Sequence, residues 1–77
     1  MSAHLYWKPA GDGERIGGPA LRDALMRKYM SGHGDHVALD HDSRDFLEGL
    51  AAGGVDGAAE LLRLIDEHGA IDVWVQG

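Results

Sequence analysis

Residues 70–76 alternate strictly, and this pattern constrains the fold more than any other feature of the chain: Ile71, Val73 and Val75 fall on one side, and Asp72, Trp74 and Gln76 on the other. Such alternation is typical of a strand with one face in the core. Residues 4–8 alternate in the same way, and Pro9 ends that strand because it has no backbone donor. Since a lone strand is unstable, we expect the two segments to pair, with residues 37–39 as a candidate third strand.

Apolar residues recur at helical spacing in three stretches between these strands, which predicts helices over residues 19–30, 43–52 and 57–68. Pro19 stands at the first helical position, where its missing N–H costs nothing. Asp42 or Ser43 is placed to cap the second helix, and Asp56 to cap the third. In the first helix, Asp23 and Arg27 are spaced as an ion pair four residues apart.

These elements predict a single α+β domain over residues 1–77, a small α/β fold whose two- or three-stranded sheet is covered on one face by three helices. Residues 10–18 contain four glycines and are expected to form a loop. Tyr6 and Trp74 would then lie on the sheet face away from the helices, where nothing remains to cover them. A reversed strand phase, or a loop 10–18 folded over these rings, is the alternative.

The length of 77 residues and the absence of cysteine exclude several classes of protein. A chain this short is too small for most enzyme folds, and we assign it no catalytic residue. Without cysteine it forms no disulfide and no cysteine-based zinc site. Its apolar stretches are far shorter than a membrane span, and residues 1–4 lack the features of a signal peptide, so we expect a cytoplasmic protein that does not contact membranes.

The formal charge of −6 is unevenly distributed along the chain. Residues 1–34 carry five basic and three acidic residues, a balance of +2, whereas residues 35–77 carry two basic and ten acidic residues, a balance of −8. Nucleic acid is bound through Lys and Arg that displace counterions, so we expect no direct contact with nucleic acid. A protein with a basic surface is the favoured partner, although an acidic surface also serves solubility alone.

The candidate partner-binding residues combine the two uncovered aromatic rings with acidic residues of the second and third helices: Tyr6, Trp74, Asp45, Glu48, Glu60 and Glu67. The carboxylates would steer and orient a basic partner, and a ring would supply a desolvated anchor. The exposed face or the edge of the sheet could instead pair two copies of the chain in a homodimer.

A His- and Asp-rich segment over residues 33–42 is the candidate metal site, with His33, Asp35, His36 and His41 as the ligands. Imidazole and carboxylate groups suit zinc, nickel or manganese. The alternative interpretation is a polar loop that leads to a helix cap, in which case the chain needs no cofactor.

Four segments together form a pattern that extends over most of the chain: Leu5-Tyr6-Trp7, Pro19-Ala20-Leu21-Arg22, Leu47-Glu48-Gly49-Leu50 and Ile71-Asp72-Val73-Trp74. In this overall pattern the chain resembles the short proteins encoded by bacteriophages and prophages. The resemblance implies a non-enzymatic accessory protein. Some small acidic proteins of this kind, among them anti-CRISPR and other anti-defence proteins, cover a basic surface of a host complex.

The function expected from the sequence is therefore that of a non-enzymatic acidic inhibitor, which covers a basic and nucleic-acid-binding surface of a host protein. The alternatives are a metal-binding domain that uses residues 33–42 and a structural homo-oligomer.

Overall fold

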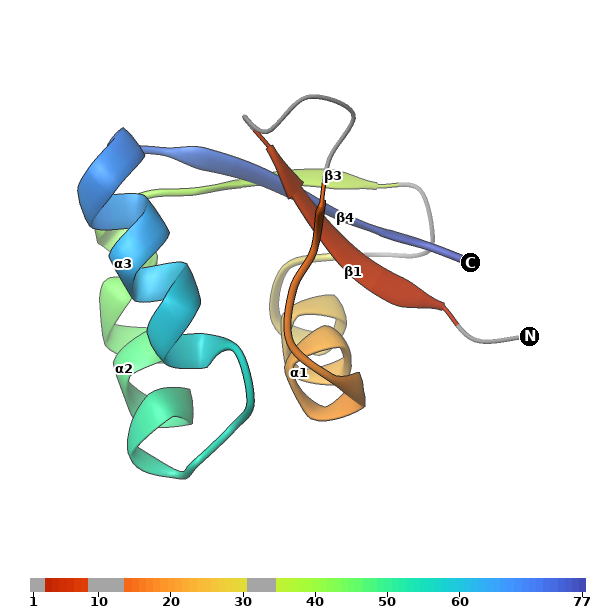
Figure 1. The fold of residues 1–77 in the computed structure, drawn as a ribbon, viewed down its shortest axis with the longest axis horizontal. Coiled ribbons are helices and arrows are strands. Elements are labelled where there is room, and N and C mark those ends of the chain that lie inside the picture. The colour runs from red at the N-terminus through yellow and green to blue at the C-terminus, as the bar shows by residue number, and fades with distance from the viewer. Residues whose placement is uncertain (1–2, 9–13, 31–34) are drawn as a thin grey trace.

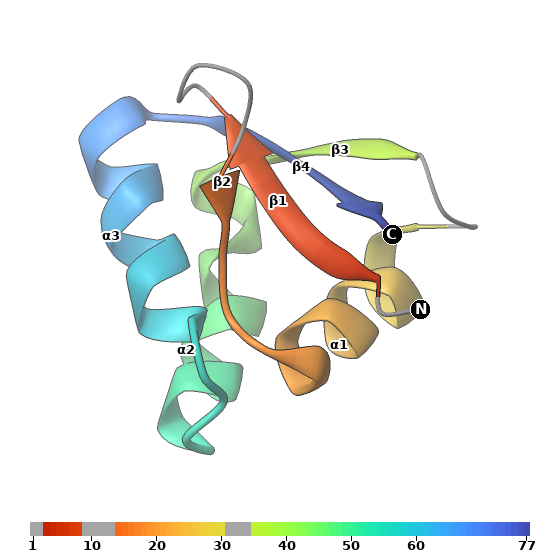
Figure 2. The same cartoon turned by 45° about the vertical axis from the view of Figure 1, so that its right-hand side comes forward.

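The computed structural model describes residues 3–8, 14–30 and 35–77 of the chain. Four antiparallel strands form one sheet in the order β2-β1-β4-β3. These strands are β1 (His4–Lys8), β2 (Glu14–Arg15), β3 (His36–Leu39) and β4 (Ile71–Gln76). The helices are α1 (Pro19–Tyr29), α2 (Arg44–Ala52) and α3 (Ala58–His68), and a short 3₁₀ helix, η1 (His41–Ser43), leads into α2. All three α-helices lie on one face of the sheet (Figure 1 and Figure 2).

The predicted α+β architecture is confirmed, with one more strand than expected. The terminal strands pair directly, and Leu5 lies opposite Val75. Segment 37–39 is a strand, longer by one residue, on the outer side of β4. The additional strand, β2, lies within the predicted loop over residues 10–18, of which residues 10–13 are outside the described part of the chain. Because β2 has only two residues, it is too short to show an alternating pattern.

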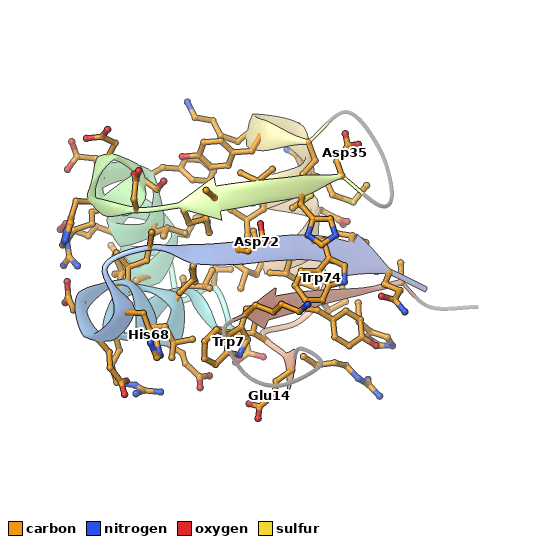
Figure 3. The ribbon with its side chains drawn as sticks, turned by 90° about the horizontal axis from the view of Figure 1, so that it is seen from above. Trp7, Glu14, Asp35, His68, Asp72 and Trp74 are labelled. Carbon is orange, nitrogen blue, oxygen red and sulfur yellow. The ribbon has the colours of Figure 1, made fainter. Side chains whose placement is uncertain are left out.

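The core lies between the sheet and the helices. The strand side chains that were predicted to face the helices are all buried: Leu5, Trp7, Ile71, Val73 and Val75. The helices contribute a matching set of fully buried side chains: Leu21, Leu25, Leu47, Leu61 and Ile65. Each such side chain stabilises the fold by about 1.5–3 kcal/mol. His68, in the last turn of α3, lies beside the ring of Trp7 with 5.7 Å between ring centroids (Figure 3).

The starts of the second and third helices differ from the prediction. Ser43 occupies the predicted N-cap position of α2, but its side chain makes no capping hydrogen bond there; the side-chain cap lies upstream, at Asp40, because η1 precedes the helix. The Asp40 carboxylate accepts a hydrogen bond from the backbone of Asp42 at 3.0 Å, and the backbone N–H of Asp40 donates to Ser43 Oγ at 3.3 Å. Asp56 does not cap α3, whose capping position is taken by Gly57 without a side-chain hydrogen bond.

Gly57 is required where two distant loops touch. Its φ of +88° is a left-handed conformation that glycine adopts without strain. A Cβ atom at Gly57 would lie 2.5 Å from the Cα atom of Gly17, which is shorter than any normal contact. The loop before α1 and the loop before α3 therefore pack backbone against backbone. This contact sets the distance between the N-terminal ends of α1 and α3.

We predict that Gly57→Ala destabilises the protein more than Gly54→Ala does. Both glycines have positive φ, so each substitution costs about 1–2 kcal/mol of backbone strain. Only Gly57 has a neighbour within 4 Å of the added Cβ, and this overpacking costs a further 1–3 kcal/mol or so. Urea unfolding followed by tryptophan fluorescence measures both changes, and equal losses for the two variants would show that the contact with Gly17 is unimportant.

Candidate functional site

The sheet face away from the helices, here called the open face, is defined by the strand register. Partners across antiparallel strands share a face, so the register places nine described residues on it: His4, Tyr6, Lys8, Arg15, His36, Ala38, Asp72, Trp74 and Gln76. One row runs across all four strands, in which Arg15 lies opposite Tyr6 and both Tyr6 and His36 lie opposite Trp74. The predicted strand phase is therefore correct.

Trp74 is nevertheless covered, which corrects the expectation of an uncovered ring. Only 6% of Trp74 is exposed. The ring of His36 stacks on it with 4.8 Å between centroids, and the ring of Tyr6 stacks on it at 6.0 Å. Lys8 Nζ lies 5.6 Å from the same indole, and the indole N–H donates to Gln76 Oε1 at 3.1 Å. Among the described residues, aromatic side chains of β1 and β3 and the polar side chains of Lys8 and Gln76 surround the tryptophan.

The remaining polar groups of the open face contact one another. His36 Nδ1 lies 2.7 Å from Asp72 Oδ2, on the adjacent strand. The guanidinium of Arg15 lies 3.3 Å from the ring of His4. Figure 3 looks onto this face and shows Trp74 and Asp72 along β4. Within the described sheet, Asp72 is the only carboxylate on the open face, which also carries Lys8 and Arg15.

The predicted acidic residues lie elsewhere, on the helical hairpin formed by α2, α3 and their connection. This acidic hairpin, residues 44–68, carries six carboxylates and two arginines, and every one of the six acidic residues is exposed: Asp45, Glu48, Asp56, Glu60, Asp66 and Glu67. The helices place them outward because the apolar stripe of each helix faces the core.

Two arginines organise these carboxylates. Arg44 on α2 pairs with Asp66 on α3 and lies 3.8 Å from Glu48, so it links the outer sides of the two helices. Arg63 lies 3.5 Å from Glu60 and 3.2 Å from Glu67, one turn away on either side. Exposed pairs of this kind contribute little to stability, at most about 1 kcal/mol each. They neutralise part of the acidic charge, and the hairpin retains an excess of six carboxylates over two arginines.

The structure thus separates residues that the sequence analysis grouped as one partner-binding site. Asp45, Glu48, Glu60 and Glu67 lie on helices beneath the sheet, whereas Tyr6 and Trp74 lie on the opposite side of it (Figure 1). A single flat partner surface cannot contact both sets. Sequence reasoning missed the cations beside the rings: Lys8 could be found from the alternation of β1, but the two-residue strand that places Arg15 carries no such signal.

The structure gives no support to the predicted metal site. Of its four candidate ligands, His33 lies outside the described residues. In the part of the chain that is described, no three His, Asp or Glu side chains are grouped to hold a metal ion. His36 begins β3 and His41 follows its end, and an extended chain advances about 3.3 Å per residue, so the strand carries these two imidazoles apart.

We predict that Trp74 contributes to stability as a core residue does. Trp74→Ala removes a nearly buried ring together with its stacking contacts to Tyr6 and His36, which lowers the free energy of unfolding by about 3 kcal/mol or more. Arg63→Ala serves as the control, because that side chain is 62% exposed and its two ion pairs along α3 contribute at most about 1 kcal/mol each. Chemical denaturation measures both variants, and a Trp74→Ala protein as stable as the parent would contradict the assignment.

The fold and the site of this chain are interpreted from the chemistry of its residues, because comparisons with known proteins found no match. No helix among the described residues has the length and apolar character needed to cross a membrane. Searches with the sequence and with the fold found no matching family model, no matching curated protein and no matching solved structure.

Proposed function

We propose that this chain is a non-enzymatic binding module that sets its acidic hairpin against a basic surface of a partner protein. The observation that carries the proposal is the concentration of exposed carboxylates there, six against two arginines within residues 44–68. Opposite charge steers association and orients the partner, and a basic partner surface compensates the excess negative charge. The chain is, on this proposal, an inhibitor of the kind that phages direct against host defence, and it occupies a surface that would otherwise bind nucleic acid.

The ion pairs within the hairpin favour this use. Glu60 and Glu67 lie on the same side of α3, 3.5 and 3.2 Å from Arg63, so the rigid helix presents both carboxylates to a partner together. Preorganisation of this kind lowers the entropic cost of association. Asp45 and Glu48 extend the same charge along α2, which Arg44 joins to α3 through Asp66.

The test compares two variants that remove the same number of charges. The first is Asp45→Asn, Glu48→Gln, Glu60→Gln and Glu67→Gln, on the hairpin. The control is Glu14→Gln, Asp23→Asn, Asp35→Asn and Asp42→Asn, outside it. A partner is first captured from a nuclease-treated bacterial extract on the immobilised chain, and is then purified so that its affinity can be measured by calorimetry at several salt concentrations.

We expect the hairpin variant to bind that partner about tenfold or more weakly, with a flatter dependence on salt, and the control to bind as the parent does. A short DNA duplex should compete with the parent chain for the partner. Equal affinities of the two variants would exclude the acidic hairpin as the binding surface.

A second copy of the chain is the alternative partner, and the position of β3 favours it. This strand lies at the outer edge of the sheet, and its sequence, HVAL, contains neither proline nor lysine, the residues that commonly protect an edge. Light scattering of the purified chain gives the molar mass directly. A dimer that Val37→Pro converts to a monomer would assign the interface to β3.

A further inference from the structure

A groove with an apolar floor lies between α1 and α2, on the side of α2 that faces α1. Its volume is about 340 Å³, and it is lined by Ala24, Arg27, Lys28, Phe46 and Leu50. Phe46 and Leu50 are four residues apart on α2, so they form one stripe along the groove, while Leu47 beside them is fully buried in the core. Phe46 and Leu50 pack against the core but are only partly buried, so the groove leaves part of each side chain accessible.

The floor of the groove is held in place by neighbouring rings. Phe46 packs edge-to-face against Tyr29, with 5.7 Å between centroids and 89° between the ring planes. This is a favourable geometry for two aromatic rings. The apolar surface is therefore already formed before a ligand arrives, as is usual for binding pockets.

The rim of the groove carries positive charge in a protein whose net charge is −6. Arg27 and Lys28, in the last turn of α1, are its only charged lining residues in the described part of the chain. Lys28 Nζ lies 5.5 Å from the centre of the Phe46 ring, directly above the apolar floor.

The carboxylate nearest to these cations along α1 is engaged elsewhere. Asp23 was predicted to pair with Arg27, but Arg22 Nε donates a hydrogen bond to it at 2.9 Å. That hydrogen bond is the main cause of the lowered pKa of Asp23, and the charge of Arg27 contributes less. Arg27 therefore has no close carboxylate partner among the described residues and is available to an external anion.

We propose that this groove binds an anionic amphiphile, with an aliphatic chain on Phe46 and Leu50 and a carboxylate between Arg27 and Lys28. The groove volume falls at the lower end of the range for small-molecule sites, about 300–1,000 Å³. An unbranched fatty acid supplies an apolar chain for the floor formed by Phe46 and Leu50 and a carboxylate for the cationic rim. The proposal is independent of the proposed function, since the acidic hairpin uses the outward sides of α2 and α3.

The test uses dodecanoate as the probe, below its micellar concentration, with the parent chain and two variants. Arg27→Gln with Lys28→Gln removes the rim charges, and Lys8→Gln with Arg15→Gln removes the same charge from the open face. Affinity is measured by calorimetry, and chemical shifts of backbone amides locate the bound probe. Dodecyltrimethylammonium, which has an equal chain and the opposite charge, tests the role of the head group.

We expect dodecanoate to bind the parent and the open-face variant equally, to bind the rim variant at least tenfold more weakly, and to shift amides of α1 and α2. Ala24→Leu, which fills the groove, should also weaken binding, and its thermal melt checks that it remains folded. Absence of binding, equal affinity for the rim variant, or equal binding of dodecyltrimethylammonium would overturn the proposal. Displacement of dodecanoate by an acidic amphipathic peptide at lower concentration would also overturn it and assign the groove to a protein segment.

Discussion

The structure depends on β4, which is enclosed on both edges and on both faces. It pairs with β1 along one edge and with β3 along the other, so it joins segments from the two ends and the middle of the chain. On the helix side, Val73 and Val75 are fully buried. On the open face, Trp74 is enclosed by the rings of Tyr6 and His36. A small chain with one layer of helices thereby obtains a central strand in which four of the six residues are buried.

This enclosure changes how the aromatic residues on the open face can contribute to binding a partner. An aromatic ring on an uncovered sheet is a natural anchor for a partner, because its burial on binding releases a large apolar area. In Trp74 that apolar area is already buried within the fold, and the indole N–H already has an acceptor in Gln76. What remains accessible on this face is polar and mildly cationic, which differs in kind from the acidic hairpin on the opposite side of the molecule.

Most of the elements could be predicted because the signals that define them are local. The alternation of residues 4–8 and 70–76 and Pro19 at a helix start each depend on a few neighbouring residues, and the structure confirms them within one residue. β2 could not be predicted, since Glu14 and Arg15 form a strand only through their partners Trp7 and Tyr6. The cap at Asp40 was missed because a turn of 3₁₀ helix extends the start of α2.

The sequence by itself determined the strands at the two ends, the three helices, the core face of the sheet and the excess of acidic residues in the second half. All of these follow from side-chain periodicity and composition, which need no knowledge of distant contacts. Only the tertiary structure decided which surface each charge belongs to. The strand register brings Lys8 and His36 from separate strands around Trp74, and the packing of three helices on one face carries the carboxylates to the other side of the molecule. These contacts between residues depend on pairing and packing of segments far apart in the chain, and no local sequence pattern predicts them.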